Sequence, residues 1–160
     1  MDSASLYPKD LEEAEPITVR QPALYTNIQY EVSAFDSRFF AELRDHGKIL
    51  GVRCPTCNRV YVPPRINCKE CFSELKEWVE VSNEGTLQTY TIVNQPGVRQ
   101  PAEPPYALGI VRLDGADTGL VHCLGGADPA QFQIGMRVRA VFEDERTGNI
   151  KDIKYFAPVD

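Results

Sequence analysis

The segment from Gly51 to Trp78 reads GVRCPTCNRVYVPPRINCKECFSELKEW and contains four of the five cysteines of the chain. These cysteines form two Cys-x2-Cys pairs, with ten residues between the pairs. In a pair with this spacing both sulfur atoms converge, and two such pairs close a tetrahedral site of four thiolates around one metal ion. The spacing therefore predicts four metal ligands, Cys54, Cys57, Cys68 and Cys71.

A site with four protein ligands leaves no position for water or substrate, so its metal stabilises a short segment that has little core of its own. We expect structural Zn²⁺. Iron accepts the same four thiolates, and a rubredoxin-like electron carrier is the alternative that these residues leave open. The turn after Cys57 requires a residue that tolerates a positive φ angle, and Asn58 is acceptable there although glycine is better.

The start of the chain, MDSASLYPKDLEEAEP, is acidic, whereas a signal peptide is basic and then apolar. No apolar run approaches the ~20 residues of a membrane span. We therefore expect a cytoplasmic protein with no membrane partner. In the reducing cytoplasm, paired thiols are more often metal ligands or catalytic groups than disulfides.

The charge of the chain is unevenly spread. Its 160 residues include 17 basic and 23 acidic side chains, and the net charge of -6 argues against a general affinity for nucleic acid. Residues 44–76 carry seven basic and three acidic side chains, whereas residues 77–160 carry seven and twelve. The cysteine segment is therefore a basic region on an acidic chain.

The pattern along the chain predicts a mainly β protein, with a short N-terminal helix, then the metal-binding cysteine segment, called the ribbon below, and then an OB-type barrel. Residues 1–34 show prolines, scattered charges and no sustained period, which indicates an extended arm. The helix is expected at 35–47, the ribbon at 48–76 and the OB-fold at 77–160. Turn residues separate strand-like runs at 77–82, 85–93, 106–113, 119–125, 136–143 and 150–158.

The stretch AFDSRFFAELRDHGK predicts the short helix. Asp36 is the expected N-cap, Phe35 and Phe40 sit at the positions of a hydrophobic staple, and Gly47 ends the helix. The expected apolar face consists of Phe39, Phe40 and Leu43, and it packs on the core. His46, in the last turn, is expected to face solvent.

The sequence offers no convincing catalytic group. His122 and Cys123 are neighbours on a predicted strand, so their side chains point to opposite faces and do not share a proton. We expect Cys123 to be a small buried residue. His46 is the only other histidine, and there is no glycine-rich phosphate loop. These features indicate that the chain alone is not an enzyme.

The order of motifs resembles that of the DUF35 family. The resemblance covers residues 35–158 and rests on FFAELRDHGKILGVRCPTCNRVYVPPRINCKEC, followed by GTLQTYTIVNQPG, PPYALGIVRLD, IGMRVRAVFED and YFAPV. Each motif is weak by itself, but together and in this order they are specific. The chain departs from the family where Asn58 and Phe72 replace the glycine that is usual after each cysteine pair.

Membership of this family implies a mainly β fold, in which an N-terminal helix and a rubredoxin-like zinc ribbon are followed by an OB-fold barrel. It also implies a non-catalytic subunit that pairs with a thiolase-like catalytic subunit in a hetero-oligomer. The partner would supply the nucleophilic cysteine and the histidines. The OB-fold would help to hold the coenzyme A part of an acyl-CoA shared with the partner. The length and the acidic, proline-bearing N-terminal segment are similar to those of a thiolase subunit from anaerobic toluene degradation.

Coenzyme A carries phosphate groups that a local basic surface attracts. The segment Asn94–Pro105, with four prolines in twelve residues, is expected to be a long loop. From their positions, Val98 in this loop and Tyr106 directly after it could form an apolar wall for the pantetheine arm. Each basic residue among the candidates given next could equally well be a solvated surface charge or a member of a salt bridge. The candidate CoA-binding residues are Arg53, Arg59, Arg65, Lys69, Arg99 and Tyr106.

A single-stranded nucleic-acid binder is a further alternative, because OB-folds and zinc ribbons both serve that purpose. It requires a basic groove with exposed aromatic side chains. The predicted OB-fold instead has seven basic and twelve acidic residues, which argues against this role.

Overall fold

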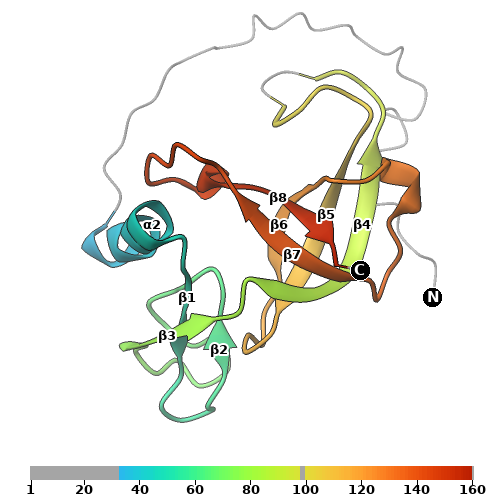
Figure 1. The fold of residues 1–160 in the computed structure, drawn as a ribbon. Coiled ribbons are helices and arrows are strands. Elements are labelled where there is room, and N and C mark those ends of the chain that lie inside the picture. Colours follow the sequence, from blue (N-terminus) through green and yellow to red (C-terminus); the bar gives the residue numbers. More distant parts are fainter. Residues whose placement is uncertain (1–32, 98–99, 160) are drawn as a thin grey trace, which may run out of the picture. The chain divides into compact units, whose positions relative to one another are not determined.

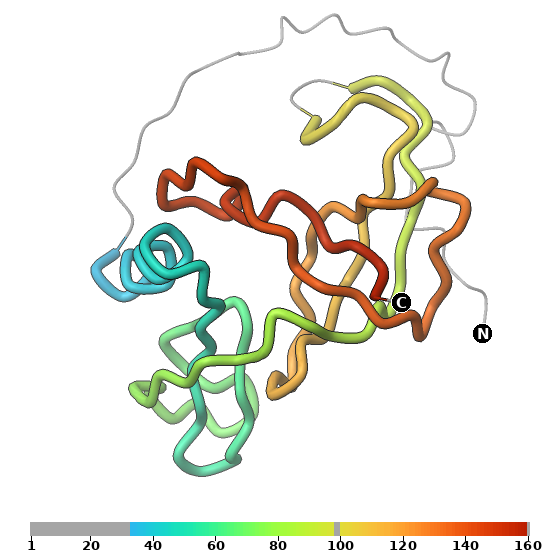
Figure 2. The backbone as a smooth tube through the Cα atoms, viewed as in Figure 1, coloured from blue at the N-terminus to red at the C-terminus, as the bar shows by residue number. Residues whose placement is uncertain are grey.

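The computed structural model describes residues 33–97 and 100–159, which belong to one compact unit. The expected arm at 1–34 therefore lies almost wholly outside the described residues, as do Val98 and Arg99. Within the described part of the chain, no helix is long and apolar enough to cross a membrane. Figures 1 and 2 show the path of the backbone, from a helix through a small sheet into a barrel.

Helix α2 spans Ala34–His46, and its N-cap is Ser33 rather than the predicted Asp36. The Ser33 hydroxyl accepts a hydrogen bond from the backbone N–H of Asp36 at 3.1 Å. The N-cap prediction was wrong because both residues are good N-caps, and the observed N-cap lies three residues before the predicted one. Gly47 ends the helix as predicted, with a φ of 63°.

The side chains of α2 divide as the apolar pattern predicted, apart from the staple. Phe39 and Leu43 are 3% and 0% exposed, and Phe40 packs partly buried against the same core. Phe35 does not staple to Phe40, because its ring packs against Trp78 with 4.7 Å between ring centroids. His46 is exposed and lies 3.0 Å from the Glu42 carboxylate.

The ribbon contains a three-stranded antiparallel sheet of order β2-β1-β3, with β1 at Ile49–Arg53, β2 at Val60–Tyr61 and β3 at Glu77–Val81. The sequence analysis assigned residues 77–82 to the barrel, but β3 pairs with β1 from Ile49↔Val81 to Arg53↔Glu77. The chain returns past the second cysteine pair to the open edge of β1, and this places the strand in the ribbon sheet.

Five strands close the barrel in the order β4-β5-β6-β8-β7, which confirms the predicted OB-type architecture. The expected strand at 150–158 is shorter, because its first three residues form the 3-10 helix η2, Ile150–Asp152. Strands β6 and β8 are joined by a single parallel pair, Leu124↔Phe156. The barrel strands are β4 Glu84–Val93, β5 Tyr106–Leu113, β6 Leu120–Leu124, β7 Arg137–Phe142 and β8 Ile153–Pro158.

One hydrophobic core runs from the helix and ribbon into the barrel. Phe39 and Leu43 of α2 and Ile49 of β1 belong to the same buried cluster as Val111 and Phe156 of the barrel. Around the cysteines the ribbon has a second, much smaller cluster, formed by Val52, Cys54, Tyr61, Cys68 and Leu75. Most of the apolar burial that holds the ribbon and barrel together therefore lies away from the cysteines.

The turn between β5 and β6 is hydrogen-bonded to the ribbon. The Asp117 carboxylate accepts from the backbone N–H of Val60 at 2.8 Å, and the Asp117 N–H donates to the Val60 carbonyl at 2.8 Å. The Thr118 hydroxyl accepts from the Val62 N–H at 2.7 Å and donates to its carbonyl at 2.8 Å. These four bonds satisfy the backbone beside β2 that would otherwise be an open sheet edge.

Candidate metal centre and ligand cavity

The four cysteines predicted as metal ligands are brought together by the ribbon. Their sulfur atoms all lie within 4.8 Å of one another, and the Cys54 and Cys71 sulfurs are 3.5 Å apart. Four thiolates around Zn²⁺ at about 2.3 Å require sulfur separations of about 3.8 Å. The donor set and its spacing therefore fit a closed tetrahedral site in which every ligand comes from the protein.

Each cysteine pair forms a tight turn that ends in a left-handed residue. Asn58 and Phe72 have φ values of 56° and 59°. Their backbone N–H groups donate to the carbonyls of Cys54 and Cys68, at 2.9 Å and 3.0 Å. The positive φ expected after Cys57 is present. Asn58 tolerates it well, whereas the aromatic Phe72 is an unusual occupant of this region.

Hydrogen-bond donors surround the sulfur atoms. The Cys57 N–H donates to the Cys54 sulfur at 3.3 Å, and the Ser73 hydroxyl lies 3.3 Å from the Cys71 sulfur. The Tyr61 hydroxyl lies 3.1 Å from the Cys68 sulfur and lowers the pKa of that thiol to about 6. Because a thiolate is the form that binds metal, the contact with Tyr61 favours ligation by Cys68, whereas a hydrogen bond with Cys71 raises the pKa of the Cys57 thiol to about 12.

The basic residues proposed for coenzyme A are largely engaged with neighbours in the ribbon. Arg53 lies 3.2 Å from Glu77, and both Arg59 and Lys69 contact Glu70, at 3.0 Å and 3.6 Å. These ion pairs are exposed, so they orient the side chains and contribute little to stability. Acidic residues next to three of the four candidates therefore weaken the local positive field.

The remaining candidates differ in their surroundings. The Arg65 guanidinium lies over the Tyr61 ring, 5.0 Å from its centroid. Tyr106 is only 8% exposed, so its ring offers little surface to a ligand, in contrast to the apolar wall that the sequence suggested. Arg99 lies outside the described residues, and its role stays a prediction.

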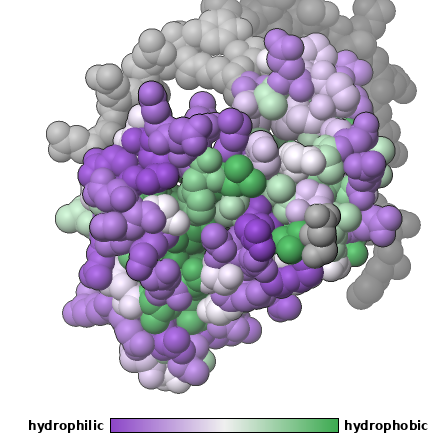
Figure 3. Space-filling view, in the orientation of Figure 1, coloured by the Kyte–Doolittle hydropathy of each residue, from purple (hydrophilic) through white to green (hydrophobic). Residues whose placement is uncertain are grey.

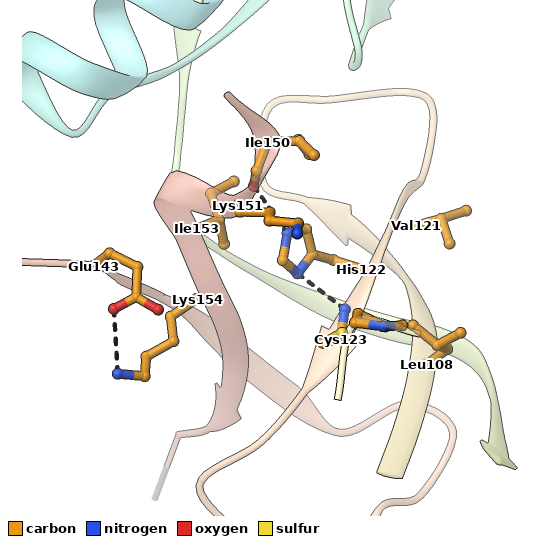
Figure 4. A pocket seen from close by; sticks show the side chains of 10 residues that line it. Leu108, Val121, His122, Cys123, Glu143, Ile150, Lys151, Ile153 and Lys154 are labelled. Carbon is orange, nitrogen blue, oxygen red and sulfur yellow. Dashed lines mark hydrogen bonds and ion pairs between the residues drawn. The ribbon is translucent and has the colours of Figure 1, made fainter. Parts of the chain in front are cut away.

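A cavity of 290 Å³ lies beside strand β6, between that strand and the η2–β8 segment (Figure 4). It opens where the barrel has only the single β6–β8 pair. Strand periodicity shows which residues face outward, but not that η2 would lie across from β6, so the sequence analysis missed this cavity. Its lining residues are Pro101, Leu108, Val121, His122, Cys123, Glu143, Ile150, Lys151, Ile153 and Lys154.

His122 in this cavity is held as a neutral side chain. Its Nε2 lies 3.1 Å from the Ile150 carbonyl and therefore donates, while its Nδ1 accepts the Cys123 N–H at 2.9 Å. Burial lowers the pKa of His122. Both ring nitrogens are occupied, so the imidazole is not free to act as a general base in this conformation.

Cys123 is not fully buried as expected, because it is partly exposed and lines the cavity. Burial raises the pKa of its thiol, which keeps it protonated. Its contact with His122 runs through the backbone N–H. At the rim, Lys154 lies 3.2 Å from Glu143, and Lys151 adds a second ammonium group. The cavity thus combines an apolar wall with two ammonium groups and one carboxylate, that of Glu143.

Two models of known domains match the chain. The ChsH2 rubredoxin-like zinc ribbon domain matches residues 41–77, and the ChsH2 C-terminal OB-fold domain matches residues 78–143. With the cysteine cluster and the closed barrel, these matches define a protein that joins a zinc ribbon to an OB-fold.

The chain belongs to the DUF35 family. It is 32% identical over 131 residues to a DUF35 domain-containing scaffold protein of Methanocaldococcus jannaschii, which covers 77% of this chain and 90% of that protein. It is 33% identical over 102 residues to a protein of the same description from Methanothermobacter thermautotrophicus, covering 61% and 74% of the two chains.

Two solved structures have similar folds. A chain of the structure described as the Ltp2-ChsH2(DUF35) aldolase is 25% identical, with a TM-score of 0.61 over 81% of this chain and 98% of that one. A DUF35 protein of unknown function from Sulfolobus solfataricus is 26% identical, with a TM-score of 0.54 over 65% and 75%. The first similarity extends over nearly the whole of a chain from a structure that is described as an aldolase.

Proposed function

We propose that this chain is a non-catalytic accessory subunit that pairs with an acyl-CoA enzyme of the thiolase type. The observation that carries the proposal is the similarity to the chain of the Ltp2-ChsH2(DUF35) aldolase, which covers 81% of this chain and 98% of that one. The relatives described as DUF35 scaffold proteins support the same general role.

The chemistry of the described residues also supports an accessory role. The four clustered thiols suit a closed structural zinc site, and both nitrogens of His122 are hydrogen-bonded. Cleavage or formation of a carbon–carbon bond next to a thioester requires an activated nucleophile or base. In this proposal the partner supplies these groups, and the present chain stabilises the partner and shares its acyl-CoA.

The narrower proposal is the zinc-finger subunit of benzoylsuccinyl-CoA thiolase, from anaerobic toluene degradation in the cytoplasm. It rests on the resemblance in length and in the acidic N-terminal segment, and residues 1–32 of that segment lie outside the described structure. The acyl group would lie mainly in the pocket of the partner. Turnover assays of the complex with benzoylsuccinyl-CoA and with acetoacetyl-CoA distinguish this substrate from a simpler one.

Co-purification tests the proposed function. The full chain, tagged and expressed in its native host, is isolated and analysed by intact-mass spectrometry and metal analysis. A stoichiometric thiolase-type or aldolase-type partner and one zinc per chain are expected, with no turnover by the isolated chain. Turnover by the chain alone, or a coloured, iron-bearing chain without a partner, would contradict the proposal. Salt-dependent binding of oligonucleotides would instead support nucleic-acid recognition.

For the shared ligand we propose the cavity beside β6 as the contact for the pantetheine arm of coenzyme A. Its apolar wall includes Leu108 and Val121, and Lys151 and Lys154 lie at the rim near the place where a phosphate could bind. Val121 is 62% exposed, which suits a residue that a ligand or a partner covers.

Val121→Glu should weaken binding of coenzyme A by at least roughly 10-fold, because it puts a carboxylate on the apolar wall and near the phosphates of the ligand. The matched control is Ile134→Glu, since Ile134 is 68% exposed and does not line the cavity. Calorimetric titration of coenzyme A into the isolated chain and into the complex measures both variants. Equal affinities for the two variants would remove the cavity from the proposed CoA site.

A further inference from the structure

Tyr61 is a fully buried tyrosine whose hydroxyl reaches the cysteine cluster. Tyr61 is 0% exposed. Removing a tyrosine hydroxyl from water costs free energy unless the hydroxyl finds a hydrogen-bond partner in the protein. The partner here is the sulfur of Cys68, 3.1 Å from the hydroxyl oxygen. A metal-bound thiolate carries no proton, so in the ligated site the tyrosine must be the donor.

The position of this hydroxyl is fixed by the backbone of β2. Tyr61 pairs with Val52 of β1 on one side. On the other side, the neighbouring residues Val60 and Val62 are bonded to Asp117 and Thr118 of the barrel. The hydroxyl is therefore placed by a strand that is held from both edges, which makes the contact with Cys68 a built feature of the fold.

Arg65 adds a charge to the same arrangement. Its guanidinium lies 5.0 Å from the centroid of the Tyr61 ring, within the range of a cation–π contact. A cation on the face of the ring draws electron density from the phenol and makes its hydroxyl a stronger donor. The same charge also lies near a site in which four thiolates and a divalent ion sum to about -2.

We propose that Tyr61 and Arg65 form an outer part of the metal centre, in which Tyr61 donates a hydrogen bond to the Cys68 thiolate and Arg65 strengthens that bond. The proposal rests on the four cysteines holding a metal ion. The hydrogen bond fixes the orientation of one sulfur and stabilises its thiolate charge, so that the metal is retained more tightly. Arg65, which the sequence suggested for coenzyme A, would thus act on the metal centre instead.

Tyr61→Phe in the full chain tests the proposal, because phenylalanine fills the same space and removes only the hydroxyl. The apparent zinc affinity, measured by competition with a chromophoric chelator, should fall by roughly 10-fold. In protein loaded with Co²⁺, the sulfur-to-cobalt charge-transfer band should move to longer wavelength, because the Cys68 thiolate becomes a stronger electron donor. Tyr90→Phe is the matched control, since Tyr90 lies in the barrel.

The two readouts separate hydrogen bonding from packing. A lower zinc affinity together with a shifted band supports the proposal. An unchanged band overturns it, even if zinc affinity falls, because that result assigns Tyr61 a packing role only. A shifted band with unchanged zinc affinity overturns the contribution to metal retention.

Arg65→Gln separately tests the part of the proposal that concerns the charge. The same band should move in the same direction, but by less than in Tyr61→Phe. The control is Arg112→Gln, which removes an exposed arginine of β5. If Arg65→Gln does not move the charge-transfer band, Arg65 has no role in the metal centre, and only Tyr61 remains in its outer part.

Discussion

At the scale of one residue, Phe72 has a strained backbone conformation and an exposed side chain. Its φ of 59° is costly for an aromatic residue, and its side chain is 79% exposed, so packing within the described chain does not offset the cost. Phe72→Gly should raise the free energy of unfolding of the zinc-loaded protein by about 0.5 to 1 kcal/mol. Denaturant unfolding at fixed zinc concentration measures the change.

The control for this prediction is Asn58→Gly, at the equivalent position of the first cysteine pair. Asn58→Gly should raise the free energy of unfolding by less than Phe72→Gly does. Asparagine tolerates the left-handed region, and the Asn58 side chain accepts a hydrogen bond from Arg53 at 3.0 Å. Equal gains at both positions would mean that the strain at Phe72 is not specific to its aromatic side chain.

The buried His122 should make the free energy of unfolding depend on pH. Burial lowers its pKa in the folded protein, so the unfolded chain binds more protons as pH falls through about 6.5. Stability is therefore retained above that pH and decreases below it. In His122→Gln, the loss of unfolding free energy between about pH 7.5 and about pH 5.5 should be smaller than in the natural chain. Chemical denaturation at both pH values measures this.

The comparison is informative because acid release of the metal affects both proteins alike. Thiolates must be deprotonated to bind metal, so acidification weakens the ribbon whatever residue stands at 122. Identical pH profiles for the two proteins would show that His122 titrates normally in the fold.

At the scale of elements, the β5–β6 turn is the main polar link between barrel and ribbon. Thr118→Val keeps the shape of the side chain but removes the hydroxyl that bonds both backbone groups of Val62. The unfolding free energy should fall by about 1 to 3 kcal/mol, because these groups lose their partner. Zinc content should stay unchanged, since the cysteines are untouched.

Thr89→Val is the control for this substitution, because Thr89 is exposed on β4 and has the same chemistry. Denaturant unfolding of both variants gives the difference. A Thr118→Val protein as stable as Thr89→Val would mean that water replaces the lost hydroxyl, and that the turn does not hold the ribbon.

At the scale of the whole molecule, the two clusters of buried residues should respond differently to loss of the metal. The ribbon cluster includes two of the cysteines, whereas the larger cluster consists of residues from α2, from the ribbon strands β1 to β3 and from the barrel. Removal of the metal should therefore loosen the ribbon far more than the barrel. Hydrogen exchange with and without chelator should show faster exchange at 49–76 and little change in β4–β8. Uniformly faster exchange would contradict two separable levels of stability.

The surface is also consistent with a protein that acts with a partner. Figure 3 shows a mostly hydrophilic face with a few apolar patches. Within the described residues, exposed large apolar side chains occur at Ile66, Phe72, Val121, Ile134 and Ile150, two in the ribbon and three in the barrel region. Single exposed apolar residues are common in proteins, so only those that line a cavity, such as Val121, enter the functional proposals.

Local spacing in the sequence determined the parts of this protein that depend on near neighbours. Two residues between cysteines bring two sulfurs together, and Gly47 stops a helix through its own φ angle. The five barrel strands follow from short apolar runs between turn residues. These features depend on spacing within one segment, which is why the metal centre and the fold class could be predicted before any contact was known.

Only the tertiary structure decided which distant segments meet. It paired β3 with β1 in the ribbon sheet, and it brought η2 against β6 to form the cavity. It also placed Tyr61 beside Cys68 and acidic residues beside Arg53 and Arg59. A sequence records the charge and size of each side chain, but hydrogen bonds, ion pairs and cavities arise from distances between segments, which long-range packing alone sets.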